Sequence, residues 1–471
     1  MGPRAFVSSA AVLAALAAAA PAPAAAGAGA EAEAVLLENA RVLPVSGPEI
    51  PRGMVLLRGT RIAAVGVSVE VPAGARRVDL AGRTLCPGFV DAASRAGFAP
   101  SERGAAGRDP EVPAADGADL AAPAFAAARA AGVTSLVLSP GAPRGAFAGR
   151  LALVKPVPGG GLEARVADAL GPVKAVLAPP GALPSLERAN TAAGLRAAFR
   201  GAVEYAEARE KYGRDMASFL ADAAAFAAAG DAPEEALLPA AVIERLRRLD
   251  PEPREAARKA LRARLGMKDP EKPAKPPHRP AETREDPAKE VLLAATRGEV
   301  PVRFEAHAVE DLRSALALAA EFHLRASVEG GLEGARVAAA LAEAKVPLAC
   351  WPAAGPGPEP GGPPAEALPA AAAAAGARTA VATGDDGPFA VRHLVVGAAL
   401  AAGRGLDRAA ALRAVTLDAA AAAGWEGRIG SIEPGKDADL VVLDGDPLAA
   451  GTLVVAVWID GAEVPIQEEA R

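Results

Sequence analysis

Glu305 and His307 are the pair of side chains whose types and spacing most clearly allow chemistry. They lie two residues apart in the apolar segment 302–307, which reads as a short strand, and residues two apart on a strand share one face. A carboxylate and an imidazole on one face can both bind a metal ion. A second acidic pair, Asp385 and Asp386, follows another short apolar segment.

The sequence lacks the motifs of three other kinds of active or binding site. It contains no Gly-x-Ser-x-Gly turn, no paired Cys-x-x-Cys and no Walker-type loop, which argues against a serine-hydrolase elbow, a thiol redox site and a phosphate-binding loop. We interpret the remaining histidines, His278, His323 and His393, as surface or packing residues, because an isolated histidine is seldom functional.

Short strands separated by helix-length stretches are the elements that must position these side chains. Eight strand candidates occur, several of them with a helical stretch before the next. This order predicts an α/β protein with a (β/α)8 TIM-type barrel. The candidates are 85–95, 133–139, 151–155, 173–178, 302–307, 324–329, 346–351 and 379–383.

Both chain ends read instead as short alternating strands with closely spaced turns. We therefore predict a small composite β-sandwich domain from 34–85 and 428–465, with the barrel between them at 86–427. Amphipathic helical stretches and a segment rich in Pro, Lys and Glu interrupt the barrel as an insertion at about 191–290.

Three motifs carry a resemblance to the amidohydrolase superfamily. The segment 87–91, Pro-Gly-Phe-Val-Asp, resembles the family's opening strand, and 59–66 is similar to the hairpin that precedes it. The segment 430–444, Gly-Ser-Ile-Glu-Pro-Gly-Lys-Asp-Ala-Asp-Leu-Val-Val-Leu-Asp, resembles its C-terminal signature. The helical insertion is similar to that of an exported, imidazolonepropionase-like subgroup. Within the C-terminal motif we interpret Lys436 and Asp439 as turn and sheet residues.

The resemblance implies a metal site whose usual histidines are missing. The opening strand of the family carries two ligand histidines where this chain has Ala93 and Arg95, and a third is replaced by Gly330. An alanine has no lone pair, and a protonated guanidinium cannot bind a cation.

What remains of the implied ligand set is small. It consists of Glu305, His307 and Asp386, with Asp385 as the alternative to Asp386, which would also be the general base. Lys174 falls near the place of a bridging lysine, but we interpret it as a solvated side chain. This vestigial set implies no cofactor beyond a weakly held divalent ion such as zinc.

Composition and the N-terminus bear on location and partners. The chain has 51 Lys and Arg against 57 Asp and Glu, and no basic block stands out, so we expect no nucleic-acid partner. Residues 1–30 have the pattern of a secretory signal peptide, which predicts a periplasmic or secreted protein. The chain contains two cysteines, Cys86 and Cys350, and both lie in apolar segments, so we expect them to be reduced core residues.

Two functions stay open. On the first, the chain is nominally a metal-dependent hydrolase of C–N bonds, in non-peptide or dipeptide-like amides, with an eroded metal site. On the second, it is a non-catalytic paralogue that binds a small molecule or serves as a scaffold. Its expected partners are a small-molecule amide substrate or ligand, and a second copy of the chain or an active homologue.

Overall fold

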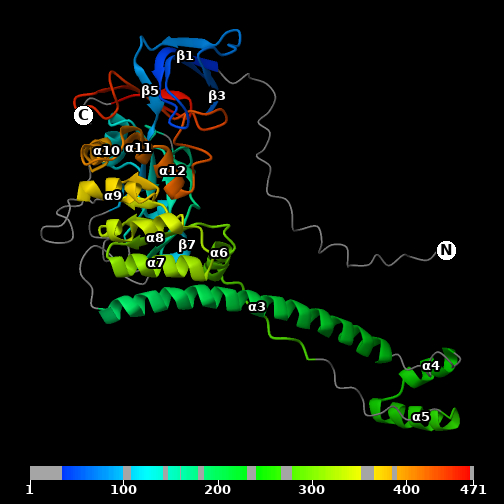
Figure 1. The fold of residues 1–471 in the computed structure, drawn as a ribbon. Helices are drawn as coiled ribbons and strands as arrows, with labels where there is room; N and C mark the ends of the chain where they lie inside the picture. Colours follow the sequence, from blue (N-terminus) through cyan, green and yellow to red (C-terminus); the bar gives the residue numbers. More distant parts are fainter. Residues whose placement is uncertain are drawn as a thin grey trace.

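The computed structural model describes residues 34–98, 108–141, 147–159, 161–178, 185–230, 240–266, 278–351, 365–384 and 390–466. Figure 1 shows three parts: a β domain that holds β1, β3 and β5, an α/β body below it, and a long helical arm that leaves the body along α3. None of the helices in these ranges is both long enough and apolar enough to span a membrane.

Strands from both chain ends form the sheet of the β domain. Its order is β19-β18-β17-β5-β1-β2-β3, and β4 pairs with β1. Alternate apolar side chains of β1 and β2, such as Leu37 and Val55, lie in its core together with the buried Trp458. The strands are β1 Ala34–Val42, β2 Ile50–Arg58, β3 Arg61–Gly66, β4 Arg76–Asp79, β5 Thr84–Pro87, β17 Leu440–Leu443, β18 Val454–Ile459 and β19 Ala462–Val464.

The predicted opening strand 85–95 is two strands in the structure. Its first part is β5, which pairs with β17 in the β domain, and its second part is β6 Phe89–Ser94 in the body. The break falls at Gly88, where a Cβ atom would lie 2.6 Å from the Thr134 Cβ atom. Glycine at this position therefore lets the chain pass from one sheet to the other without a steric clash.

The strands of the body lie in two sheets, ordered β11-β10-β8-β6 and β16-β15-β14-β13-β12-β9-β7. Each of the eight predicted segments contains at least part of a strand. They correspond to β6, β8 Val133–Leu138, β10 Ala152–Val154, β12 Val173–Val176, β13 Val302–Ala306, β14 Ala326–Gly330, β15 Leu348–Cys350 and β16 Thr379–Val381. The remaining strands are β7 Arg108–Pro113, β9 Phe147–Arg150 and β11 Val166–Asp168.

The regular alternation that the sequence predicted is interrupted at the third strand. Strands β12 to β16 are parallel in sequence order, whereas β9 and β10 run antiparallel to β12 and β8. The last strand of the body, β16, meets the first, β6: the amide of Gly384, after β16, donates to the carbonyl of Ala93 in β6 at 2.9 Å. The carboxyl ends of β6 and β16 are thereby neighbours.

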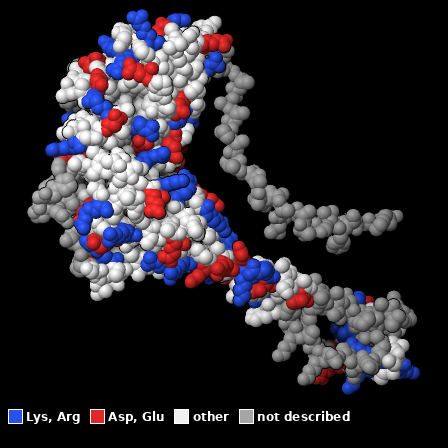
Figure 2. All heavy atoms as spheres, viewed as in Figure 1, with Lys and Arg blue, Asp and Glu red and all other residues white. Residues whose placement is uncertain are grey.

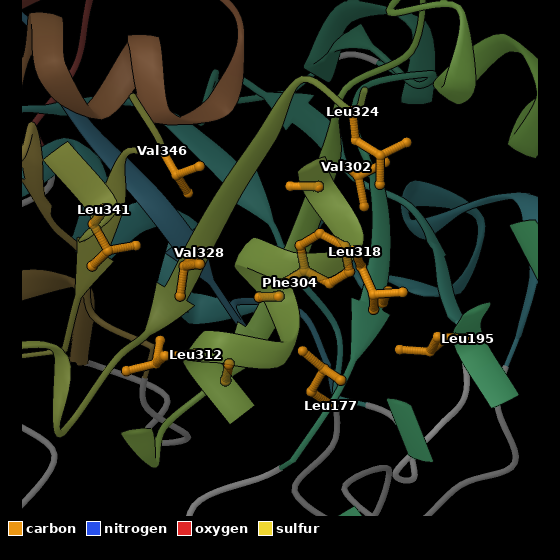
Figure 3. Close-up of a cluster of buried hydrophobic side chains, with 14 of the residues drawn as sticks. Leu177, Leu195, Val302, Phe304, Leu312, Leu318, Leu324, Val328, Leu341 and Val346 are labelled. Carbon is orange, nitrogen blue, oxygen red and sulfur yellow. The ribbon is translucent and has the colours of Figure 1, made fainter. Parts of the chain in front are cut away.

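Helices cover the outward faces of these strands. Figure 3 shows Val302 and Phe304 of β13 and Val328 of β14 packed with Leu312 and Leu318 of α7 Val309–Glu321. Removal of these apolar side chains from water is the main force that holds helices to the sheet. The other helices of the body are α1 Pro123–Ala130, α2 Leu162–Arg165, α6 Pro287–Thr296, α8 Ala338–Glu343, α9 Leu368–Ala374, α10 Leu394–Gly403, α11 Arg408–Ala414 and α12 Leu417–Ala423.

The arm consists of α3 Ser185–Gly230, α4 Ala240–Arg247 and α5 Pro251–Arg264 (Figure 1). Only the first half of α3 lies on the body, where Leu195 and Phe199 are buried against α6 and α7. From Arg209 to Asp222 most side chains are exposed. Figure 2 shows acidic and basic side chains interspersed on the visible face of the body.

A buried ion-pair network joins the body to the β domain. The Lys155 ammonium contacts Asp437 Oδ2 at 2.6 Å and Asp439 Oδ2 at 3.1 Å, and it also contacts Asp460. Burial raises the pKa of Asp439 to about 6, although Lys155 opposes the shift. Asp439 is thus a structural residue of the sheet junction, as the sequence predicted.

The two cysteines are free and buried. Burial raises the pKa of both thiols, so they stay protonated and unreactive. This confirms the prediction of reduced core cysteines.

Candidate functional site

Glu305 and His307 lie where the sequence predicted, at the carboxyl end of β13. The strand alternates strictly, since Val302, Phe304 and Ala306 pack into the helix-covered core. Arg303, Glu305 and His307 therefore share the opposite face. Glu305 and His307 are only 1% and 4% exposed.

Lys174 of β12 lies between two carboxylates. Its Nζ is 2.6 Å from Glu305 Oε2, contacts Glu329 Oε1 and lies 3.0 Å from Ser139 Oγ. The prediction that Lys174 is solvated was wrong, because the residue is fully buried. A lysine is buried to this extent only where carboxylates neutralise it, as Glu305 and Glu329 do here.

Glu329 of β14 has further partners. Ser139, directly after β8, lies 2.7 Å from Glu329 Oε2 through its Oγ, and Arg303 Nη1 is 3.4 Å from the same oxygen. Arg303 is fixed in turn by Ser327 Oγ at 2.8 Å and by the carbonyl of Ala422 at 2.7 Å. Both oxygens of this carboxylate are thus engaged by neighbours.

Arg95 and Trp351 lie beside Glu305. Arg95 Nη2 is 3.5 Å from Glu305 Oε1, and its guanidinium lies 5.4 Å from the centre of the Trp351 ring. The Trp351 and His307 rings are 5.0 Å apart and inclined by 60°. His307 Nε2 is 3.8 Å from Glu305 Oε1, which is longer than a hydrogen bond.

These side chains come together because the carboxyl ends of the strands meet at one edge. We name them the strand-end cluster; it comprises Arg95, Ser139, Lys174, Arg303, Glu305, His307, Glu329 and Trp351. Burial would raise the pKa of Glu305. The charges of Lys174 and Arg95 and the contact with His307 outweigh it, so this pKa lies well below its usual range.

Gly330 lies directly under the His307 ring. It has φ +90°, and a Cβ atom there would lie 2.7 Å from His307 Nδ1 and 2.8 Å from Nε2. A larger residue therefore cannot be accommodated while His307 keeps this position. Ala93, on β6, is buried in an apolar cluster with Ala382 and Trp351.

Asp91 fixes the end of β16. Its carboxylate accepts hydrogen bonds from the Thr383 amide at 3.0 Å and from the Thr383 hydroxyl. Burial raises the pKa of Asp91 to about 6, and these hydrogen bonds oppose the shift. Asp385 and Asp386, which follow Thr383 after Gly384, lie outside the described residues, so the predicted catalytic role of Asp386 stays a prediction.

The described residues do not fit a hydrolytic metal ion. Within the described ranges, no group of three or more His, Cys, Asp and Glu side chains is arranged to hold one. The carboxylates of Glu305 and Glu329 face the ammonium of Lys174 instead. A cation at this point would have to displace Lys174.

Several members of the cluster were absent from the sequence prediction. Arg303 could have been found by the rule that placed Glu305 and His307 on one face, since it lies two residues before Glu305. Ser139 and Trp351 follow apolar strands directly, which is where side chains reach a strand-end site. Nothing in the local sequence pairs them with Glu329 or His307.

Comparison with known proteins decides the family. Residues 109–465, more than half of the chain, match the family described as the amidohydrolase family. The chain belongs to the amidohydrolase family. An amidohydrolase from Thermotoga maritima MSB8 shares 26% identity and a TM-score of 0.65, with 91% of this chain and 99% of that chain covered.

Two further relatives are more distant. A prolidase crystallised with N-methylphosphonate-L-proline has 19% identity and a TM-score of 0.50, with 92% of this chain and 100% of that chain covered, and shows the fold alone. The amidohydrolase tasK of Hapsidospora irregularis is 35% identical over 83 residues. Those residues are 18% of this chain, and the match spans 8% of the length of tasK.

Proposed function

We propose that this amidohydrolase-family chain binds a small molecule at its strand-end cluster without metal-dependent hydrolysis. The observation that supports this is the position of the Lys174 ammonium, which is fully buried and in contact with both Glu305 and Glu329. A built-in cation at this point supplies the positive charge that a metal would otherwise supply to the two carboxylates.

The chemistry of metal-dependent amide hydrolysis explains why this contact matters. A catalytic zinc site needs three protein ligands and an open position for water. Lys174, Ser139 and Arg303 occupy the carboxylate oxygens that such a site would require. Breaking a buried ion pair leaves an uncompensated charge and costs about 3–5 kcal/mol, so a weakly held ion would not compete.

The finer parts of the family assignment belong to the same proposal. We propose that β6 to β16 correspond to the (β/α)8 barrel, and that 34–85 and 428–465 form the satellite domain. Ala93, Arg95 and Gly330 would then stand where relatives carry ligand histidines, and the helical insertion would place the chain in an imidazolonepropionase-like subgroup. The residual site would be Glu305 and His307, with Asp386 beside them.

Metal analysis and an activity assay test the proposal. Purified chain, saturated with zinc and then dialysed, should retain roughly 0.1 mol zinc per mol or less. It should turn over no cyclic amide, N-acyl amino acid or dipeptide; an active prolidase, run in parallel, is the positive control for the dipeptides. Stoichiometric zinc together with turnover that Asp386→Asn abolishes would establish the hydrolase instead.

Removing the built-in cation gives a second test. Lys174→Met frees Glu305 and Glu329 beside His307, so its zinc affinity in a calorimetric titration should rise by about tenfold or more over the unsubstituted chain. Lys345→Met, an exposed lysine in the same body, is the matched control and should leave zinc binding unchanged. Equal zinc binding in all three proteins would contradict the role given to Lys174.

We also propose that residues 1–30 direct export to the periplasm. Recovery of the chain in a periplasmic fraction, with N-terminal sequencing of the product, tests this. Light scattering on the same material tests whether it pairs with itself, and co-purification tests pairing with an active homologue.

A further inference from the structure

We infer that the strand-end cluster binds the carboxylate of a small organic ligand through Trp351, His307 and Arg95. This inference rests on the proposed function, because it names the ligand class of the same cluster. It starts from polar atoms that the folded chain leaves without partners.

Two buried rings carry these atoms. Trp351 is 3% exposed and His307 4%, yet the indole Nε1 and both imidazole nitrogens lack a hydrogen-bond partner among the residues that the structure describes. A buried polar group left unpaired costs about 1–3 kcal/mol. A ligand that pairs with these atoms would recover that free energy.

The chemistry of the rings restricts the ligand. The indole N–H can only donate, and imidazole always carries at least one donor, so the ligand must present acceptors. His307 follows β13 and Trp351 follows β15, and the two rings meet over the end of β14, which lies between these strands, with their centres 5.0 Å apart. Two acceptor atoms of one small planar group, such as a carboxylate, could reach both rings.

Charge favours an anionic acceptor over a neutral one. Among the residues that the structure describes, the cluster brings together three cations, Arg95, Lys174 and Arg303, and two carboxylates, Glu305 and Glu329. Asp91 lies on β6, and its carboxylate is bound by the amide and the hydroxyl of Thr383. The guanidinium of Arg95 lies over the Trp351 ring, so its positive charge is close to the indole N–H that lacks an acceptor.

A pair of probes that differ only in the carboxylate tests this. N-acetylglycine should bind in a calorimetric titration, and N-acetylglycinamide, which lacks the charge, should bind at least about tenfold more weakly. Inorganic phosphate should also bind more weakly than N-acetylglycine. Equal binding of the two acetylated probes, or no binding of N-acetylglycine, would overturn the inference. This test needs only the unsubstituted chain.

Variants then locate the site. Trp351→Phe keeps an aromatic side chain and removes the N–H donor, so the Kd for N-acetylglycine should rise at least about fivefold. Trp458→Phe is the matched control, because Trp458 is also fully buried, has an unpaired Nε1 and has an arginine, Arg76, over its ring, but lies in the β domain. Arg95→Met, with folding checked by circular dichroism, should weaken the binding as Trp351→Phe does. An unchanged Kd in Trp351→Phe would place the carboxylate elsewhere.

The outcomes separate this inference from the proposed function. Hydrolysis of N-acetylglycine to acetate and glycine would refute the non-hydrolytic role while the carboxylate site stood. If the chain binds no zinc, hydrolyses none of the substrates and binds both acetylated probes equally, only the carboxylate site is refuted.

Discussion

The imidazole of His307 fills the space that any side chain at Gly330 would need. Its Nδ1 lies 2.7 Å from the position of a Cβ atom on Gly330, whose φ of +90° already disfavours other residues. His307, directly after β13, thus determines which residue the end of β14 can carry at position 330. The His307 ring thus packs against the backbone of Gly330, which has no side chain.

Substitution of Gly330 tests this contact. Gly330→Ala should lower the free energy of unfolding by about 2–4 kcal/mol, because the positive φ and the overlap with His307 both cost energy. Gly74→Ala is the control, since Gly74 has φ +84° but no atom within 4 Å of the Cβ position, and it should cost about 1 kcal/mol. Urea unfolding measures both. Equal losses would mean that His307 moves aside freely.

Lys174→Met should destabilise the chain by about 3–5 kcal/mol at pH 7, because two buried carboxylates lose their cation. In the unsubstituted chain the pKa of Glu305 is depressed, so its contribution to stability is present above the unfolded pKa and is lost as pH falls. The deficit of the variant should therefore begin to shrink only as the pH falls below the ordinary carboxyl pKa of 4.5. Lys345→Met, at an exposed site, should stay within about 0.5 kcal/mol at each pH. A deficit that does not vary with pH would argue against charge as its cause.

Asp91 should make the chain less stable as pH rises. Its pKa is about 6 in the folded chain against an ordinary 3.8, so the folded state holds a proton that the unfolded state has released. Its stabilising contribution is complete below about pH 4 and is lost as pH rises through 6, a change on the order of 3 kcal/mol. The difference in unfolding free energy between the unsubstituted chain and Asp91→Asn, measured from pH 4 to 7, should show this slope. The titration of Asp439 is common to both proteins and cancels.

Local patterns predicted much of the fold for physical reasons that are visible in single segments. The alternation of β13 places Glu305 and His307 on one face, and the C-terminal motif indicated that Asp439 is a structural residue. The family resemblance is confirmed by the match over 109–465. Period-2 alternation and turn residues are local, and so they can be read without knowing what lies opposite.

Contacts across strands could not be predicted in this way. Lys174 reads as an ordinary lysine at the start of a strand, and only the register Val176↔Glu305 and Glu305↔Glu329 brings its ammonium to both carboxylates. The antiparallel course of β10 could not be predicted either, because a three-residue apolar strand has the same pattern in either direction. Strand direction and partner depend on residues far away in the sequence.

The arm provides a last prediction, because α3 offers the same substitution in two environments. Phe199 is fully buried, with the Phe322 ring 5.3 Å and the Phe147 ring 6.1 Å away, whereas Phe219 is half-buried on the part of the helix that leaves the body. Phe→Ala changes helix propensity equally at both sites, so the difference between the two variants measures packing against α6 and α7. Phe199→Ala should cost about 3–5 kcal/mol in chemical denaturation, and Phe219→Ala less than about 1 kcal/mol. Equal costs would show that the arm folds as one unit with the body, and that its outer half contributes to stability through contacts of its own.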